Sequence, residues 1–571
     1  MPELRSNFTP GTTPWAVRRA QWRALGIPDA DMDKPKIAVV NTSSELSSCF
    51  SHLDELAAVV KEGVRAAGGL PFEIRTTAPS DFVTNAGRQA RYLLATRDLL
   101  VNDIEVVVEG ALLDGMVCLS SCDKTTPGHL MAAARLNVPT IVVTGGYQDH
   151  GIHRDEPVDI EDVFESVGAV SDGRLSVDEL RRMCDVAVCG PGVCAGMGTA
   201  NTMHVAAEAL GMTLPGASLI PARGERVRSL AHAAGERIVG LVEEDLRPRD
   251  VMTEGAFANA VRTCLAVCGS VNALRHLQGV ATEAENGVDV YALYEKWSRQ
   301  IPLLTAVRPN GPIRVDELDR AGGTRAVMKG LERWQDPAAR TVSGRTAGEL
   351  LAETAVADPA VVGTVDEPHA PAPTLLLLYG SLAREGGIMK RGAAGGELRF
   401  RGPARVFDTQ DGAMEAIRDR RIGSGDVVVL RGLGPQGGPG VASASWFVAA
   451  IHGAGLGEDI AVVTDGQLSG LNHGVVVGQV CPEAAVGGLI GLVEDGDEIT
   501  IDTATATVDL LVPDAEVERR RAAWKPPEPT SERGWLAIYQ RLVRPLSEGA
   551  VIVPRRPGDE PSARPVVPGG S

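Results

Sequence analysis

The stretch Ser121-Cys122-Asp123-Lys124-Thr125-Thr126-Pro127-Gly128 places a thiol, a carboxylate and an amine in three consecutive residues. Residues 116–119 before it predict a buried strand. Residues 129–136 after it predict a helix, capped by Thr126 and with Pro127 in its first turn. Open α/β sheets bind ligands at such strand-to-helix turns, and helix N-termini favour anions. The stretch indicates either a ligand site or a surface turn with a half-buried cysteine.

The same pattern of strand, polar loop and helix occurs elsewhere in the first half of the chain. Residues 36–40 predict a strand that runs into a loop ending at Cys49, and an apolar stripe predicts a helix after it. A Gly-rich loop containing Cys194 precedes a predicted helix that runs to about residue 210. This alternation, with a further strand at 140–144, predicts an α/β fold with a mostly parallel sheet.

The second half of the chain has a different character. Residues 145–175 are acidic and predict a loop, and residues 224–335 predict mainly helices. We place a domain boundary after residue 368, which gives a large N-terminal α/β domain, 1–368, and a smaller C-terminal domain, 369–554. Glycine-rich turns separate short β-rich runs in the latter and predict a β-barrel-like domain; these runs are residues 375–378, 426–430, 460–464 and 498–511. Residues 555–571, rich in Pro, Arg and Gly, predict a disordered tail.

Composition excludes several classes of function. The net charge of −18 is spread along the 571 residues, which argues against nucleic acid or an anionic membrane as a partner. No apolar run approaches the roughly 18 residues that cross a bilayer, and the N-terminus lacks the apolar core of a signal peptide. The nine cysteines are odd in number and form no Cys-x-x-Cys pair, so they indicate neither a disulfide framework nor a zinc ribbon. These features predict a cytoplasmic protein whose thiols are mostly buried, although some could be ligands brought together by the fold.

Five separated motifs together resemble one family, the iron–sulfur-dependent dihydroxy-acid and sugar-acid (aldonate) dehydratases, which include 6-phosphogluconate dehydratase. The resemblance covers about residues 30–510 in the family's order. The motifs are Ser44-Glu-Leu-Ser-Ser-Cys49, Cys122-Asp-Lys-Thr-Thr-Pro-Gly128, Pro191-Gly-Val-Cys-Ala-Gly-Met-Gly198, Gly434-Pro-Gln-Gly-Gly-Pro-Gly440 and Thr464-Asp-Gly-Gln-Leu-Ser-Gly470. The resemblance implies a large α/β domain, a smaller β-barrel-like domain, and a homodimer or homotetramer.

The resemblance also implies two cofactors. An iron–sulfur cluster, more often 2Fe–2S than 4Fe–4S, would be held by Cys49, Cys122 and Cys194. Three thiolates leave one iron open to substrate. A Mg²⁺ ion would be held by Asp81, Asp123 and a carbamylated Lys124, because carbamylation supplies the oxygen donors that Mg²⁺ prefers. Without the resemblance, Lys124 would be interpreted as an ion-pair partner of Asp123, and Asp81 as a helix cap.

The implied reaction is the loss of water from a 2,3-dihydroxy carboxylic acid, which yields a 2-oxo acid. Ser469 would be the base, Lys124 would belong to the catalytic set through Mg²⁺, and the open iron would act as a Lewis acid on the leaving hydroxyl. A free serine is a poor base, so it needs a neighbouring cation to hold its alkoxide. The small-molecule partner is therefore a hydroxy acid, from either the dihydroxy-acid or the sugar-acid branch.

One departure from the family's pattern concerns the metal. After Gly-Gly-Pro-Gly the family has Met-Pro-Glu, whose Glu is a further Mg²⁺ ligand, whereas this chain has Val441-Ala442-Ser443. Three hypotheses follow: a working dehydratase with a weaker metal site, an altered substrate that completes the site, or a non-catalytic or repurposed iron–sulfur paralogue. Further departures at Val271, Ser381 and Arg384 lie in motifs expected to face the substrate.

Overall fold

The computed structural model of the protein describes most of the chain. The described ranges are residues 3–77, 80–84, 90–171, 173–371, 374–391, 397–438, 444–453, 455–457, 459–468, 474–528 and 533–554. Nothing is described of the side chains at 82, 84, 165, 168, 171 and 446. Ser443, Ser469 and the predicted tail 555–571 all lie outside the described residues.

A four-stranded parallel sheet forms the centre of the N-terminal part. Its strands are β1 (Lys36–Asn41), β2 (Leu70–Arg75), β3 (Gly115–Ser120) and β4 (Thr140–Thr144), in the order β2-β1-β3-β4. Every residue of β1, β3 and β4 is buried, as expected of strands covered on both faces. The predicted strands at 36–40, 116–119 and 140–144 and the parallel α/β arrangement are therefore confirmed.

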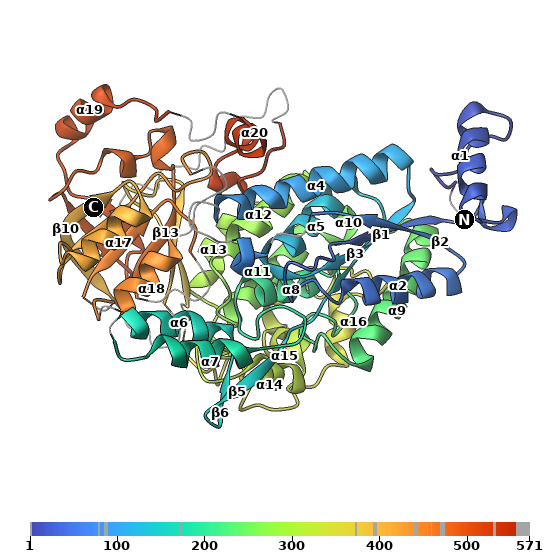
Figure 1. The fold of residues 1–571 in the computed structure, drawn as a ribbon, viewed down its shortest axis with the longest axis horizontal. Coiled ribbons are helices and arrows are strands. Elements are labelled where there is room, and N and C mark those ends of the chain that lie inside the picture. The colour runs from blue at the N-terminus through green and yellow to red at the C-terminus, as the bar shows by residue number, and fades with distance from the viewer. Residues whose placement is uncertain are drawn as a thin grey trace.

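Helices flank this sheet. In Figure 1 the sheet lies between α4 and α5 on one side and α2 and α9 on the other. Their bounds are α2 (Leu53–Ala66), α4 (Tyr92–Ala111), α5 (Cys122–Leu136) and α9 (Glu225–Glu244). The axes of α2 and α9 approach closely because glycines face backbone at the crossing: a Cβ added to Gly63 would lie 2.1 Å from the carbonyl oxygen of His232, and one added to Gly235 would lie 2.3 Å from that of Val60.

The start of α5 differs from the prediction. The helix begins at Cys122, seven residues before the predicted His129, and Pro127 lies inside it. Thr126 does not cap it: the N-cap is Ser121, whose backbone N–H donates to the side-chain oxygen of Thr125 at 3.0 Å. Pro127 is the sixth residue of the helix, so its missing N–H leaves the carbonyl oxygen of Asp123 without the usual intrahelical bond. Cys122, Asp123 and Lys124 are consequently held in the first helical turn rather than in a loop.

The acidic stretch 145–175 is also more ordered than predicted. It contains β5 (Asp149–His153), β6 (Glu156–Val158) and α6 (Ile160–Ser171). Glu161 and Asp162 lie in the first turn of α6, where negative charge interacts favourably with the helix dipole. The acidic residues therefore mark a helix start, which the composition alone does not distinguish from a loop.

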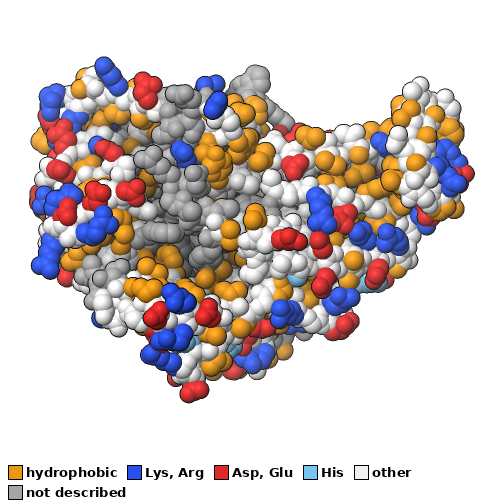
Figure 2. Space-filling view, in the orientation of Figure 1, with side chains coloured by type: hydrophobic (Ala, Val, Ile, Leu, Met, Phe, Trp, Pro, Cys, Tyr) orange, Lys and Arg blue, Asp and Glu red, His pale blue; other side chains and the backbone are white. Residues whose placement is uncertain are grey.

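The rest of the N-terminal part is helical, as predicted for residues 224–335. Its elements are α1 (Thr13–Ala24), α3 (Asp81–Thr84), α7 (Val177–Ala187), β7 (Val188–Cys189), α8 (Thr199–Ala209), α10 (Pro248–Val251), α11 (Glu254–Ala266), α12 (Asn272–Ala284), α13 (Val290–Ser298), α14 (Val315–Arg320), α15 (Gly323–Gly330) and α16 (Ala347–Ala352). Helix α1 projects from the body of the molecule (Figure 1), and none of its residues is buried. Figure 2 shows apolar and basic side chains together on this projection.

An eight-stranded mixed sheet forms the C-terminal part, in the order β15-β14-β10-β11-β12-β13-β9-β8. Residues next to its two edge strands also pair: the Tyr379 N–H donates to the carbonyl oxygen of Ala506 at 3.0 Å, and the Val508 N–H donates to that of Tyr379 at 2.8 Å. The sheet is thus nearly closed, which confirms the barrel-like prediction. Its strands are β8 (Leu375–Leu378), β9 (Gly386–Lys390), β10 (Arg399–Phe407), β11 (Val427–Leu430), β12 (Ala461–Thr464), β13 (Val475–Cys481), β14 (Glu498–Asp502) and β15 (Thr507–Leu510).

Four helices accompany the barrel, and two of them contact the N-terminal part. The four are α17 (Gln410–Arg418), α18 (Ser445–Gly453), α19 (Asp514–Ala523) and α20 (Trp535–Leu542). Helix α18 packs against α6, and α20 packs against α4. Fully buried Arg97 of α4 donates to the carbonyl oxygens of Gly549 and Ala550 at 3.0 and 2.8 Å, which fixes the C-terminal segment on the first domain. Among the described helices, none combines the length and the apolar character needed to cross a bilayer.

The glycine crossing of α2 and α9 gives a stability prediction. We expect Gly235→Val to lower the free energy of unfolding by about 3 kcal/mol, because the added side chain meets the Val60 backbone, which cannot move without separating the helices. Gly240→Ala in the same helix is the control, since its Cβ meets only the flexible end of Arg237 at 3.0 Å. We expect it to stabilise by up to about 1 kcal/mol in denaturant titration. Equal midpoints for the two variants would contradict this packing.

Candidate functional site

The carboxyl ends of the parallel strands bring the predicted site residues to one edge of the sheet. Cys49 lies in the loop after β1, Asp81 follows β2, and Cys122 follows β3 directly. Cys194 reaches the same edge because the Val193 N–H donates to the carbonyl oxygen of Gly146, just after β4, at 2.9 Å. This edge is where open parallel sheets bind ligands.

Three thiols from separate loops gather there. Cys49 and Cys122 are hydrogen-bonded through their side chains, and Cys194 lies close enough to interact electrostatically with Cys49. The hydrogen bond from Cys122 lowers the pKa of Cys49, and the same bond together with burial raises the pKa of Cys122 well above its usual value. The loops are tied together by the Ser121 hydroxyl, which donates to the carbonyl oxygen of Cys49 at 2.6 Å.

The backbone also holds these cysteines in place. Cys122 has φ of 66°, a left-handed conformation that is strained for a residue with a Cβ. Such strain is found where a side chain is aimed at a functional site. The Gly192 N–H donates to the carbonyl oxygen of Ser48 at 3.2 Å, which joins the Cys194 loop to the Cys49 loop. Three thiols held this way fit a cluster that takes three thiolates.

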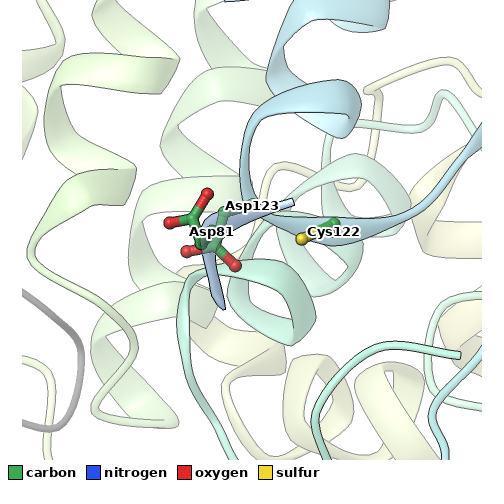
Figure 3. Close-up of side chains that lie close together, drawn as sticks. All are labelled: Asp81, Cys122 and Asp123. Carbon is green, nitrogen blue, oxygen red and sulfur yellow. The ribbon is translucent and has the colours of Figure 1, made fainter. Parts of the chain in front are cut away.

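Two carboxylates lie beside the thiols. Ligand atoms of Asp81, Cys122 and Asp123 are all within 4.8 Å of one another, and Figure 3 shows the two carboxylates side by side with the sulfur next to them. Burial, and then the charge of Asp81, raise the pKa of Asp123 well above its usual value. The Oδ1 atom of Asp81 is buried without a hydrogen-bond partner. This arrangement attracts a cation, since like charges this close are unfavourable when buried.

Lys124 partly compensates these charges. Its side chain is fully buried, and its Nζ lies 3.0 Å from Oδ2 of Asp81 and 3.7 Å from Oδ2 of Asp123. The predicted contact with Asp123 is therefore the longer of the two, and the closer partner is Asp81. One ammonium and two carboxylates leave a formal charge of −1 when both acids are ionised, which suits a divalent cation with oxygen ligands.

The first layer of residues around the acids was not assigned a role by sequence analysis. The Thr199 hydroxyl, at the start of α8, is hydrogen-bonded to the Asp123 carboxylate. Thr199 Oγ1 lies 2.8 Å from Oγ of Ser270 and accepts from Nδ2 of Asn272 at 3.0 Å. Thr199 lies within the third family motif's helix, and Ser270 and Asn272 lie in a predicted helix break. The sequence therefore showed where these residues lie in the predicted elements, but it could not show that Thr199 contacts Asp123.

The glycine-rich turns of the second half are built around buried carboxylates. Glu483 accepts from the backbone N–H groups of Gln436 and Gly437, each at 2.9 Å. Asp465 accepts from those of Gly432 and Leu433 at 3.1 and 2.9 Å. Burial, and then the charge of Asp465, raise the pKa of Glu483 to about 8. These two acids hold the backbone of the glycine-rich loops in place. The sequence therefore predicted turns here and did not indicate a functional site.

Ser469 and Ser443 themselves are not described, but their neighbours are. The carbonyl oxygen of Leu468 accepts from Nδ2 of Asn272 at 2.9 Å. The Ala444 N–H donates to the carbonyl oxygen of Gln467 at 2.8 Å. The segments that precede Ser469 and follow Ser443 are therefore joined, and the first of them contacts α12 of the N-terminal part.

The carboxylate pair gives a metal prediction. We expect Mg²⁺ at about 100 times its Kd to stabilise the protein by about 2.7 kcal/mol, measured as a rise in Tm. Asp123→Asn should largely abolish this rise, because it removes one of two anionic ligands. The control is Asp178→Asn, whose carboxylate is 73% exposed and pairs only with Arg181 among the described ion pairs. A Mg²⁺-dependent rise that survives in Asp123→Asn would place the ion elsewhere.

Comparison with known proteins agrees with this geometry. The family model for the dihydroxy-acid/6-phosphogluconate dehydratase N-terminal domain matches residues 34–350, and that for the C-terminal domain matches residues 360–550. A protein named dihydroxy-acid dehydratase from Ignicoccus hospitalis is 41% identical over 545 residues, which are 94% of this chain and 98% of that protein.

Two further relatives bear the same name. The one from Methanococcoides burtonii is 40% identical over 554 residues, 96% of this chain and 100% of its own length. The one from Moorella thermoacetica is 42% identical over 541 residues, 94% of this chain and 98% of its own length. Because both family models match and these relatives align over nearly the whole chain, the protein belongs to the dihydroxy-acid/6-phosphogluconate dehydratase family, a family of hydro-lyases.

Proposed function

We propose that the protein removes water from a 2,3-dihydroxy carboxylic acid, either a dihydroxy acid or a sugar acid, and releases a 2-oxo acid. The observation that most supports this proposal is the meeting of three cysteines with an Asp–Asp–Lys group at one edge of the sheet. The relatives are named for dihydroxy acids. The family description also includes 6-phosphogluconate, so both branches of substrate stay open.

We assign two cofactors to this group. Cys49, Cys122 and Cys194 would hold an iron–sulfur cluster, for which 2Fe–2S is the favoured type. Asp81, Asp123 and a carbamylated Lys124 would hold Mg²⁺. When bound, the cluster supplies an open iron that acts as a Lewis acid, and Mg²⁺ stabilises negative charge on substrate oxygens. The fit rests on three grouped thiols and on the orphaned buried oxygen of Asp81.

The chain's own residues then have defined tasks. Ser469, as the alkoxide, takes the proton from C2, and the electron pair of that C–H bond forms the C2–C3 double bond as the C3 hydroxyl leaves as hydroxide. The hydroxide takes the proton from Ser469, which forms water and restores the alkoxide. The resulting enol tautomerises to the 2-oxo acid. Thr199 orients Asp123 by its hydrogen bond, and the buried Lys124 keeps the acidic pair together before the metal arrives. Burial of these groups strengthens every electrostatic interaction among them.

The protein is also proposed to act as a homodimer or homotetramer. Helix α1 projects from the single chain with no buried residue, and its exposed apolar side chains include Val17, 57% exposed. Apart from Trp22, which contacts Phe72, this helix leaves apolar side chains exposed, and such a surface suits a contact with a second copy.

A specific observation favours a second candidate function. Ser443 stands where the family has a metal-binding Glu, so the chain could be a non-catalytic or repurposed iron–sulfur paralogue. Such a protein would hold the cluster and catalyse no loss of water. The intact cysteines, Asp81, Asp123, Lys124 and Ser469 favour the enzyme.

An anaerobic assay of 2-oxo-acid formation tests the function. The panel holds 2,3-dihydroxyisovalerate, pentonates, hexonates and 6-phosphogluconate, with the cluster and Mg²⁺ reconstituted. We expect turnover with one of these substrates. Ser469→Ala should lower kcat by at least about a hundredfold, since general-base catalysis contributes about 10²–10⁴-fold, and should leave the cluster absorption unchanged.

Cysteine variants are the controls of this assay. Cys122→Ser should lose the cluster absorption, whereas Cys184→Ser, at an exposed position, should keep both cluster and turnover. If the cluster is intact and no substrate of the panel is turned over, the result would favour the non-catalytic paralogue.

The metal ligand missing at residue 443 gives a separate prediction. Ser443→Glu should tighten Mg²⁺ binding by at least about tenfold, since a ligand charge worth about 1.4 kcal/mol changes an equilibrium constant by that factor. The measurement is a Mg²⁺ titration followed by calorimetry, and Ser443→Gln is the neutral control. No tightening in Ser443→Glu would show that this loop does not reach the metal.

A further inference from the structure

Asn272, the first residue of α12, uses its whole side-chain amide to join the two parts of the protein. Its Nδ2 donates to the carbonyl oxygen of Leu468 at 2.9 Å and to Oγ1 of Thr199 at 3.0 Å. Its Oδ1 accepts from Nε2 of Gln479 at 3.2 Å, and the residue is 1% exposed. Leu468 directly precedes Ser469 in the chain, so this bond holds the last described residue before the proposed base.

The same network reaches the acidic pair. The Thr199 hydroxyl also interacts with the Asp123 carboxylate. Its Oγ1 lies 2.8 Å from Oγ of Ser270, where either hydroxyl can donate, and it accepts from Nδ2 of Asn272. A continuous chain of hydrogen bonds thus runs from Asp123 through Thr199 and Asn272 to Leu468. It links the proposed metal ligand to the peptide bond of the proposed base.

Arg275, one turn further along α12, holds the neighbouring residue of the same segment. Its Nη2 donates to Oε1 of Gln467 at 2.6 Å. Gln467 in turn accepts the Ala444 N–H on its carbonyl oxygen at 2.8 Å. A second side chain of α12 therefore fixes Gln467, and Gln467 is in turn joined to Ala444.

The guanidinium of Arg275 forms no ion pair with the described residues, although the more distant charge of Asp81 acts on it. The side chain is fully buried, its Nε and Nη1 have no hydrogen-bond partner, and it takes part in none of the described ion pairs. Burial, and then Arg97, lower the pKa of Arg275 to about 9, and the titratable groups that face it are Arg97, Tyr539, Tyr291 and Asp81. A buried cation that has no ion pair among the described residues is unfavourable for folding, which points to a role other than stability.

We propose that Asn272 and Arg275 are positioning residues for the proposed base: they fix Leu468 and Gln467, the described residues that precede Ser469 in the chain, and Arg275 keeps a positive charge beside Gln467. The proposal rests on the function proposed above. A nearby positive charge favours a serine alkoxide, which a serine base requires. Asn272 therefore fixes the backbone before the proposed base, and Arg275 supplies the positive charge that the base requires.

Kinetics of two near-isosteric variants test the proposal. Asn272→Asp keeps the shape but removes both donors, and Arg275→Met removes the charge and the donor. We expect each to lower kcat by about 10–100-fold with KM changed less than about threefold, because small misplacement of a catalytic group costs about this much. Cluster absorption and the Mg²⁺-dependent rise in Tm should stay as in the wild type.

Two readouts separate this role from a structural one. Arg275→Met should raise Tm while lowering kcat, since it removes an unpaired buried charge, and it should move the rise of kcat to higher pH. Arg275→Lys should keep the wild-type pH profile. The control, Thr282→Val, removes a 3.0 Å bond from the other end of α12 to the carbonyl oxygen of Glu548 and should leave kcat unchanged. A loss of kcat that follows a loss of Tm or of the cluster would overturn the proposal.

Hydrogen exchange tests the same residues without activity. In Asn272→Asp and Arg275→Met we expect the peptide spanning residues 466–474 to exchange at least about threefold faster, and the peptide spanning 278–290 to be unchanged. If the wild type shows no turnover, the proposed function fails, and this measurement still decides whether α12 holds the segment. Unchanged exchange at 466–474 would overturn the positioning role in an active or an inactive protein.

Discussion

The arrangement of the whole site depends on burying two carboxylates next to each other. Asp81 and Asp123 come from loops after different strands, and their contact is unfavourable unless positive charge is supplied. Lys124 supplies one such charge at 3.0 Å from Asp81, and a divalent cation would supply the rest. The buried parallel sheet makes this possible, because rigid strands hold the loop ends in place against the repulsion. The helix start at Cys122 adds further support, since Cys122 and the two charged residues after it are fixed in one helical turn.

Most secondary structure in this protein could be predicted because its signals are local. The buried runs at β1, β3 and β4 are continuous apolar segments bounded by polar loops, and their bounds agree with the structure to within about one residue. The start of α5 could not be predicted this way. Pro127 normally marks a first turn, but here Thr125 secures the N-terminus through the Ser121 N–H, and the helix extends backwards past the proline. The acidic start of α6 was missed because charge alone does not separate a loop from a helix start.

The site could be predicted only where its residues lie in motifs. Cys49, Cys122, Cys194, Asp81 and Lys124 were named from a resemblance, and the structure brings these side chains to one edge of the sheet. Asn272 could not be assigned a role, because its contact with Leu468 joins positions 196 apart in the chain. Arg275 is harder still: in a sequence, an arginine on a helix suggests an exposed face, whereas here it is fully buried. Long-range contacts of this kind are set by the docking of two domains, which no local pattern encodes.

The docking of the domains also explains why the site combines a rigid sheet edge with buried charges that are unfavourable for folding. The acids and thiols belong to the sheet edge of one domain, while the proposed base belongs to a loop of the other. Either set is incomplete alone, so catalysis requires a fixed relation between them. Side chains of α12 contribute to that relation, and one of them, Arg275, is a buried cation that has no ion pair among the described residues. Selection for stability alone would replace such a group with an apolar one of similar size. We therefore infer that Arg275, which contacts Gln467, is retained because it helps to position the proposed base and supplies positive charge, at some cost to the stability of the fold.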